Sequence, residues 1–348
     1  MSIRTYSRAN KIVELMQVPV AEYDLDWLKE SLQAAVDLEL STLPVYLCGQ
    51  WSIQSGSGPV YDQLNNIILE EMLHLGLACN MLTAIGGTPQ ISSNIPTYPG
   101  PLPGGVNPNL TVTLAGLTLD QVYDVYMAIE YPENGPVIPN TNPAPKQAPA
   151  PSYPTIGNFY DAILAAFQQV NPIFTGQHQL TVTFNSLNQT HNEVFPINNL
   201  TDVQNAIEVI KEQGEGTSTS PQDEDADFAH YYRFAEIWNG KMLVQVNGQW
   251  QYAGDAITIP AVYPMAPIPA GGYTNVPANV QSDLDAFNQA FAGMLNGLQA
   301  AWNGTGSIDD AIGQMFSLPS LAQTILQIPL DSNNPSLGNY GPNFVLPG

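Results

Sequence analysis

Two long helical patterns, separated by the five-residue turn SGSGP, constrain the fold of this chain more than any other feature. The first covers about residues 24–54 and the second about 60–85. Both repeat apolar side chains at the i, i+3, i+4 spacing that places them on one helix face. Because the turn is short, the two helices must lie antiparallel. The pattern therefore predicts a helical hairpin at the centre of a bundle.

Polar residues interrupt the apolar stripe of both helices. Glu39 falls between Val36 and Leu43 in the first, and Glu71 and His74 fall within the run IILEEMLHLGLACNML in the second. Glu71 and His74 are three residues apart, so they share one helix face. A buried charge is costly unless it is paired or binds a metal. We therefore expect Glu39 to lie across the hairpin from the Glu71/His74 pair.

This arrangement is typical of one half of a dinuclear metal site. Helical bundles that bind two iron or manganese ions use a Glu from each of two helices and a Glu-x-x-His pair from each of the other two. The carboxylates offset the charge of the two ions, which lets the ions lie in the protein interior. The alternative is that Glu39, Glu71 and His74 are separate hydrogen-bonded polar residues. Their occurrence together favours the metal site.

The helix expected over 199–216, with Thr201 or Asp202 as its N-cap, offers acids for the other half. Glu208, Glu212 and Glu215 would share one face of this helix. Their mutual repulsion, and the negative end of the helix dipole near the last two, favour a compensating cation.

A further helix is expected over 223–238 and carries an Asp-x-x-His pair. Asp227 and His230 would lie on one face, with the shorter acid in place of Glu. The two remaining histidines, His178 and His191, lie in or beside a strand and a loop, and we expect them at the surface.

Two more residues are candidates for contact with a substrate. Arg233 is on the same expected helix as His230 and could bind a carboxylate, or it could form a structural ion pair with Glu236. Tyr46 is the second candidate, although a core position fits it as well.

The other segments complete a mainly helical chain. Helices are expected over 119–131, 155–170 and 280–302, with shorter ones to about 327. Alternating residues predict short strands at 109–117 and 178–186, and an Asn-Gly turn at 247–248 predicts a hairpin. The Pro-rich segment 132–154 is expected to be an extended surface connection. Cys48 and Cys79 are expected to be buried free thiols.

The charge of the chain limits its partners. Eight Lys+Arg against 31 Asp+Glu give a formal net charge of −23, which would repel nucleic acid and favour cationic ligands such as metal ions. No run of eighteen apolar residues occurs, and the N-terminus lacks the apolar segment of a secretory signal. We therefore expect a cytoplasmic protein with no contact to a membrane or to nucleic acid.

Several phrases of the sequence, taken together, resemble one family. In chain order they are LQAAVDLELSTLPVYL, LEEMLHLGLACNMLTAIGGTPQI, PTYPGPLPGG, IEYPE, TIGNFYDAI, EQGEG and HYYRFAEI, within roughly residues 20–240. They are similar to the ferritin-like domain family whose best-known members are the iminophenyl-pyruvate dimer synthases of bisindole pathways such as violacein biosynthesis.

The resemblance implies a ferritin-like helical bundle with Pro-rich loop insertions and a few short β-strands. We expect a single domain over 1–348, with the bundle core at about 24–240 and the residues after 240 packed on it. The resemblance implies a metal site at Glu39, Glu71 and His74, with the EQGEG and HYYRF phrases lining the same cavity. It leaves the choice between Glu212 and Glu215 open, and it adds Glu130 of IEYPE as a further candidate ligand.

These observations favour an enzyme: a di-iron oxidase or oxygenase of secondary metabolism that uses O2 or peroxide to oxidise a small amino-acid-derived or aromatic substrate. Manganese or a mixed metal pair would suit the same ligands. The alternatives are a ferritin-like protein that binds metal without catalysis, and an interaction module whose site has degenerated. A homo-oligomer is a further candidate state.

Overall fold

The computed structural model describes residues 7–132, 135–136, 138, 155–187, 191–217, 219–223 and 225–347. Most of the Pro-rich segment 132–154 lies outside the described residues, so its expected extended form is not tested. The described chain is mainly helical, with strands only in two small antiparallel pairs. The expected fold class is confirmed.

The predicted hairpin consists of α2 (Leu25–Ser52) and α3 (Pro59–Ala84), the two helices with the most extensive mutual packing. Asp24 caps α2, as expected, by accepting a 2.8 Å hydrogen bond from the backbone N–H of Trp27. Pro59 begins α3, where its missing N–H leaves no helical hydrogen bond unmade. All residues in 34–46 and 73–84 are buried, so the centre of the hairpin is covered on every side.

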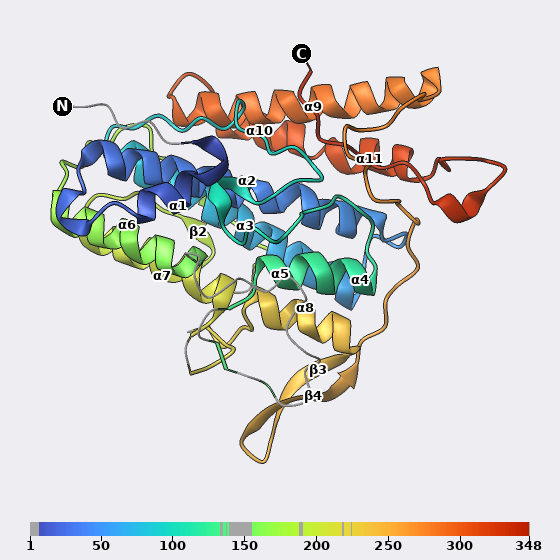
Figure 1. Cartoon of the computed structure of the whole chain (residues 1–348), viewed down its shortest axis with the longest axis horizontal. Coiled ribbons are helices and arrows are strands. Elements are labelled where there is room, and N and C mark those ends of the chain that lie inside the picture. Colours follow the sequence, from blue (N-terminus) through green and yellow to red (C-terminus); the bar gives the residue numbers. More distant parts are fainter. Residues whose placement is uncertain are drawn as a thin grey trace.

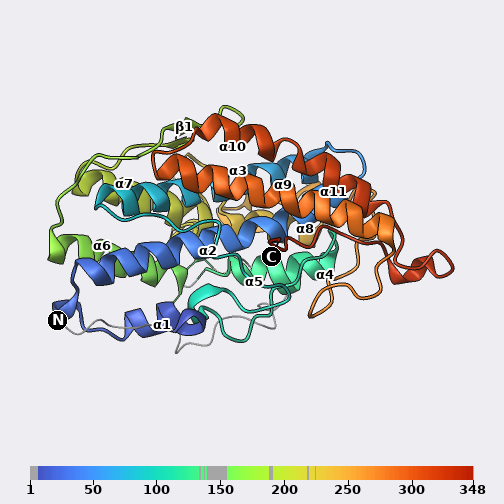
Figure 2. The same ribbon diagram turned by 90° about the horizontal axis from the view of Figure 1, so that it is seen from above.

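Shorter helices surround the two ends of this hairpin (Figures 1 and 2). One end is covered by α6 (Ile156–Val170) and α7 (Leu200–Glu215). The other end is covered by α8 (His230–Asn239) and by a continuous helical segment of α4 (Leu119–Gln121), the π-helical turn η4 (Val122–Tyr126) and α5 (Met127–Ile129). The end of α5, the start of α6 and the end of α7 line one small cavity beside the middle of α2 and α3.

A third group of helices lies on the face of the hairpin opposite the β3–β4 hairpin (Figure 1): α9 (Ala278–Trp302), α10 (Ile308–Met315) and α11 (Leu318–Leu326). α9 contacts α3, and α11 contacts α2. The indole N–H of Trp302 donates to Asn80 Oδ1 on α3 at 3.0 Å, which joins this layer to the core.

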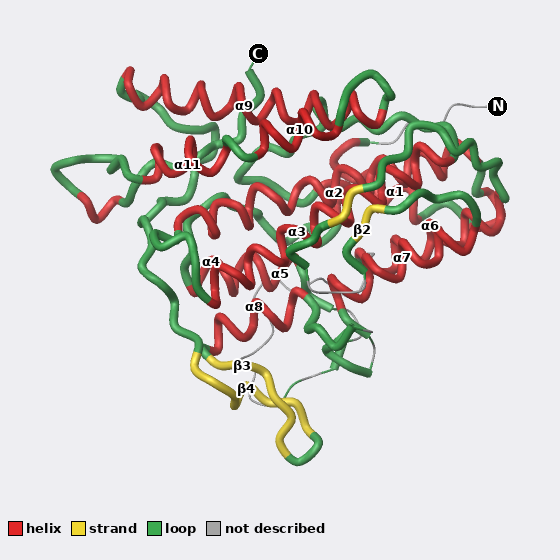
Figure 3. The backbone as a smooth tube through the Cα atoms, turned by 180° about the vertical axis from the view of Figure 1, so that it is seen from behind, coloured by secondary structure: helices red, strands yellow, loops and turns green. Residues whose placement is uncertain are grey.

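The strands are short and peripheral (Figure 3). β3 (Lys241–Val246) and β4 (Gln249–Ala256) form the expected hairpin around Asn247 and Gly248, which both have positive φ. β1 (Val182–Thr183) pairs with β2 (Glu193–Val194), which packs on α3. The remaining short elements are α1 (Lys11–Met16) and the 3-10 turns η1 (Arg8–Asn10), η2 (Val20–Glu22), η3 (Pro103–Gly105) and η5 (Pro335–Leu337).

The helix expected over 119–131 is present as the continuous segment α4–η4–α5, with a π-helical turn in its middle. Three other local predictions were wrong. The strand expected at 109–117 is a single bridge between Val112 and Gly100. Asn199, rather than Thr201 or Asp202, caps α7. The helix expected from 223 begins only at His230, because the residues before it form a turn in which Asp223 accepts from the backbone N–H of Asp227.

Candidate metal centre

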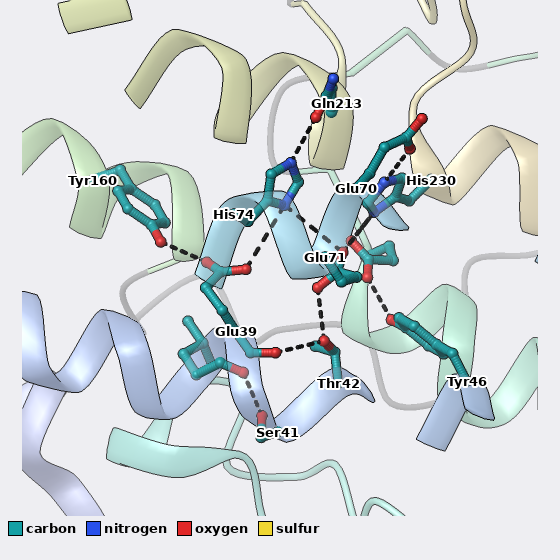
Figure 4. Close-up of polar contacts among 12 residues, drawn as sticks. Glu39, Ser41, Thr42, Tyr46, Glu70, Glu71, His74, Tyr160, Gln213 and His230 are labelled. Atoms are coloured by element: carbon teal, nitrogen blue, oxygen red, sulfur yellow. Dashed lines mark hydrogen bonds and ion pairs between the residues drawn. The ribbon is translucent and has the colours of Figure 1, made fainter. Parts of the chain in front are cut away.

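The hairpin brings its three predicted polar residues together in the buried centre (Figure 4). Glu39 on α2 and Glu71 and His74 on α3 are each at most 5 % exposed. His74 Nδ1 lies 3.7 Å from Glu39 Oε2 and 3.9 Å from Glu71 Oε1. The three can therefore present one nitrogen and two carboxylate oxygens to a common point.

Two residues from outside the hairpin complete the cluster. Glu130 directly follows α5, and His230 is the first residue of α8; both are buried. His230 Nδ1 lies 2.8 Å from Glu71 Oε1 and 3.6 Å from Glu130 Oε2. Glu71 thus belongs to two groups of possible metal ligands, one with Glu39 and His74 and the other with Glu130 and His230.

The donor set and its spacing fit two divalent metal ions that share Glu71. Within each group, the ligand atoms lie within 4.8 Å of one another. Ligand atoms bound about 2.1 Å from one ion are roughly 3.0–3.4 Å apart, and the His–Glu separations of 2.8, 3.6, 3.7 and 3.9 Å lie within about 0.5 Å of that range. The buried His230 Nδ1 has no hydrogen-bond partner in acceptable geometry, even though carboxylates surround it. A metal ion at this point would accept the lone pair of His230 Nδ1 and would offset the negative charge of the neighbouring carboxylates.

Side-chain hydroxyl groups donate hydrogen bonds to the three carboxylates and so fix their orientation. Tyr160 on α6 donates to Glu39 Oε1 at 2.5 Å, and Thr42 donates to Glu71 Oε2 at 2.6 Å. Tyr46 donates a short hydrogen bond to Glu130 Oε1. Tyr46, which the sequence offered as a candidate for substrate contact, is fully buried in the bundle. Its contact with the cluster is the hydrogen bond to Glu130.

The two histidines have different partners on their outer nitrogens. His74 Nε2 lies 2.9 Å from Gln213 Oε1 on α7. His230 Nε2 lies 2.8 Å from Glu70 Oε2, and Glu70 is also 2.7 Å from the guanidinium of Arg233. In both cases the outer partner accepts from Nε2, so that Nδ1 is left to face the cluster.

Sequence reasoning missed Glu70, Gln213 and Tyr160. Glu70 precedes Glu71 by one residue, which turns it about 100° away from the helix face that carries Glu71 and His74. It is fully buried and pairs with Arg233 on α8. The only signal was Arg233, a cation among eight in the chain, on an apolar helix. Arg233 pairs with Glu70 and not with the expected Glu236, and it is too buried to meet a substrate.

The electrostatics of the metal-free cluster reflect its excess of acid. Burial, and then the charge of Glu71, raises the pKa of Glu39 well above its usual range. Burial and the charge of Glu130 raise the pKa of Glu71. Burial and the charge of His230 lower the pKa of His74 to about 3. Burial also opposes charge on His230, but the adjacent carboxylates of Glu130, Glu70 and Glu71 outweigh it and raise the pKa of His230.

The structure does not bring the other predicted acids into either ligand group of the described residues. Glu208 is exposed, and Glu212 and Glu215 are half-buried on the face of α7 that borders a surface cleft. Asp227 lies in the turn before α8, so the three-residue helical spacing to His230 does not apply. The expectation that Glu208, Glu212, Glu215 and Asp227 join the cluster is therefore not met.

His178 and His191 are exposed, as expected, and Cys48 and Cys79 are buried free thiols, also as expected.

Two hollows adjoin each other beside the metal centre, and only the smaller one borders the ligand candidates. A cavity of about 30 Å³ borders Glu39, Glu71, His74 and Glu130, and a cleft of about 600 Å³ opens between α6 and α7. Gly157, Lys211 and Glu215 line both. Glu215 accepts a 3.0 Å hydrogen bond from the backbone N–H of Gly157 across this boundary. We call these three residues the doorway.

Among the described residues, one helix, α3, is long and apolar enough to cross a membrane, but 89 % of its most apolar window is buried inside the protein. It therefore has the character of a central bundle helix.

Comparisons with known proteins agree with this architecture. A family model described as Ferritin-like matches residues 32–239, which include all five ligand candidates. The crystal structure of a ferritin-like protein from Caulobacter vibrioides is similar, with a TM-score of 0.63 and 24 % identity over 93 % of this chain and 99 % of that chain. No curated protein matches significantly. The family model covers more than half of the chain, and the chain belongs to the ferritin-like family.

Proposed function

We propose that this protein is a dinuclear metal oxidoreductase, most simply a di-iron oxidase or oxygenase, that acts on a small amino-acid-derived or aromatic substrate. The observation that carries the proposal is the position of Glu71 between two ligand groups, each with its own histidine and its own further carboxylate. A single shared carboxylate with matched ligands on both sides suits a pair of ions better than one ion.

Each metal ion would have two ligands of its own and share a third with the other ion. Glu39 and His74 would hold one ion, Glu130 and His230 the other, and Glu71 would bridge them. Two iron ions bound in this way supply the electrons for reaction with O2 or peroxide, and manganese is a suitable substitute. The tyrosine and threonine hydroxyls restrict the carboxylates to the orientations that face the cluster.

The surroundings of the ligands limit what can approach. Leu38, Ile129, Ile156 and Ile210 line the cavity together with the ligands and keep bulk water from it. Its volume of about 30 Å³ holds a water or a diatomic molecule but no aromatic ring. An organic substrate would therefore occupy the cleft of about 600 Å³ and direct its reacting group to the doorway. The resemblance to iminophenyl-pyruvate dimer synthases favours an amino-acid-derived substrate there.

The small size of the cavity also favours a second candidate, a protein that binds the ions without catalysis. An enclosed site with no space for a ring suits retention of metal, and the acids at the cleft would attract cations.

A measurement of oxygen consumption distinguishes the enzyme from the protein that binds metal without catalysis. Metal-free protein is loaded with Fe²⁺ anaerobically and mixed with O2 alone, and then with O2 plus aromatic amino acids or their keto or imino forms. The enzyme hypothesis predicts that one of these compounds sustains O2 uptake over many turnovers, and that Glu71→Ala abolishes it. O2 uptake that ends after the bound iron is oxidised, with every compound tested, would support the binding protein instead.

A further inference from the structure

The two candidate metal positions are matched in their direct ligands. Position A has Glu39 and His74, and position B has Glu130 and His230, with Glu71 common to both. The unshared carboxylate of each position accepts a hydrogen bond from a tyrosine. On these ligands alone, the two positions would bind an ion with similar affinity.

The positions differ in what lies behind each histidine. In position A the outer partner of His74 is the neutral amide of Gln213, and the Gln213 NH2 group donates in turn to the backbone oxygen of His191 at 3.2 Å. That second bond turns Oε1 of the amide toward His74.

In position B the outer partner of His230 is the fully buried carboxylate of Glu70. Arg233, one helical turn after His230 on α8, pairs with the same carboxylate oxygen and donates from Nε to the backbone oxygen of Phe228. This pairing holds the Glu70 carboxylate in place behind His230.

A charged acceptor has a larger effect on an imidazole than a neutral one. A carboxylate that accepts from Nε2–H places negative charge next to the ring and makes Nδ1 a stronger donor to a metal, and loss of such a partner costs about 10–100-fold in metal affinity. A neutral amide orients the ring but adds no charge. The structure therefore combines two similar ligand sets with one strong and one weak supporting partner.

We infer that the two positions fill in order: position B binds its divalent ion first and more tightly, and Glu70, held by Arg233, is the positioning residue that causes the difference. The inference rests on the proposed two-metal site and adds an order of binding to it. The tightly held ion would stay in position B, while the ion in position A exchanges more readily.

Manganese binding to metal-free protein tests this order without any activity measurement. Free Mn²⁺ is followed by electron paramagnetic resonance during a titration. We expect two steps in the wild type that differ roughly 10–100-fold in dissociation constant. Glu39→Gln should retain the tight step, and Glu130→Gln should retain only the weak one. Equal affinities in these two variants, or a tighter ion in Glu130→Gln, would overturn the inference.

Two further variants assign the cause. Glu70→Gln keeps the hydrogen-bond acceptor but removes its charge, and should weaken the tight step about 10–100-fold; an unchanged tight step in folded protein would refute the role of Glu70. If circular dichroism shows that Glu70→Gln does not fold, Gln213→Glu takes its place, because a charge behind His74 should strengthen the weak step, and no change would refute the same role. A wild type that binds fewer than two ions would contradict the proposed function itself, whereas two ions of equal affinity would contradict only the order.

Discussion

The two halves of the metal centre are built differently. Glu39, Glu71 and His74 come from the middle of two long helices whose centres are buried on all sides. Glu130 and His230 come from the ends of two short helices. Both halves have outer hydrogen bonds, the first through Tyr160, Thr42 and Gln213 and the second through Tyr46 and Glu70, but only the first has its ligands placed by the packing of the hairpin. The comparison teaches that side-chain hydrogen bonds can complete a site whose first ligands are placed by helix packing.

The largest effect should come from the residue that both halves share. Glu71→Ala removes the bridging carboxylate, so the affinity for both ions should fall more than about 100-fold, because each ion loses a direct ligand and the charge that separates the two ions. Native mass spectrometry after incubation with Fe²⁺ or Mn²⁺ measures the bound ions. The matched control is Glu208→Ala, an exposed acid on α7, which should retain two. Retention of two ions by Glu71→Ala would show that it is not shared.

The second effect concerns stability without metal. The raised pKa of Glu39 means that the buried site opposes its ionised form. Glu39→Gln should therefore stabilise the metal-free protein at pH 8, with a Tm higher by a few degrees, while it removes one ion. Thermal unfolding in the presence of a chelator measures the gain. A lower Tm in folded Glu39→Gln would show that the carboxylate stabilises the metal-free fold.

The pH dependence should distinguish the metal-free from the loaded site. The pKa of His230 lies above its unfolded value of 6.5, and those of Glu39 and Glu71 lie above 4.5, so the metal-free folded state holds protons that the unfolded state releases. Its free energy of unfolding should fall as pH rises from about 6.5 to 9. The lowered pKa of His74 acts in the opposite direction near pH 6.5, where the unfolded imidazole still carries part of a proton, and it adds nothing above about pH 8, where this residue is neutral in both states.

In the loaded protein the ions replace these protons, so stability should hold or increase over the same range. Denaturant unfolding at pH 6.5 and pH 9, with and without Mn²⁺, checks both profiles. Parallel profiles with and without metal would contradict metal binding at these groups.

The smallest effect should be on the rate of metal uptake, after a substitution in the doorway residue Gly157. A Cβ added at Gly157 would come 2.9 Å from Glu215 Oε2, so Gly157→Ala should displace the Glu215 carboxylate where the cleft meets the cavity. We expect the rate at which metal-free protein takes up Mn²⁺ to change several-fold while the equilibrium affinity stays within about twofold, because no ligand is altered. Stopped-flow uptake and equilibrium titration measure the two. A change in affinity with an unchanged rate would argue against this route.

The same contrast explains what the sequence could predict. Helical periodicity located α2 and α3, and the spacing of Glu71 and His74 on one apolar face was enough to propose their half of the site. The Asp-x-x-His spacing also proposed His230, which the structure places in the second ligand group, although its expected partner Asp227 lies outside it. Asp227 and Glu212 matched the expected spacing, but the turn before α8 and the outward face of α7 keep them out of both ligand groups. Glu130 entered only through the family resemblance.

The hydrogen-bond partners of the two histidines, Glu70 and Gln213, could not be predicted from the sequence for a related reason. Glu70 and Gln213 are buried by tertiary contacts that join segments far apart in the chain: Glu70 and His230 are 160 positions apart, and His74 and Gln213 are 139 positions apart. Local patterns cannot report such pairs. The buried Arg233 would have been the useful signal, because a cation in an apolar helix requires a buried acid.

Anomalous X-ray diffraction from crystals of the iron-loaded protein, recorded on both sides of the iron absorption edge, tests the central claim most directly. The account predicts two peaks about 3.5–4 Å apart, one beside His74 and Glu39, the other beside His230 and Glu130, with the Glu71 carboxylate between them. A single peak, or iron bound elsewhere with Glu71 contacting no metal, would contradict it.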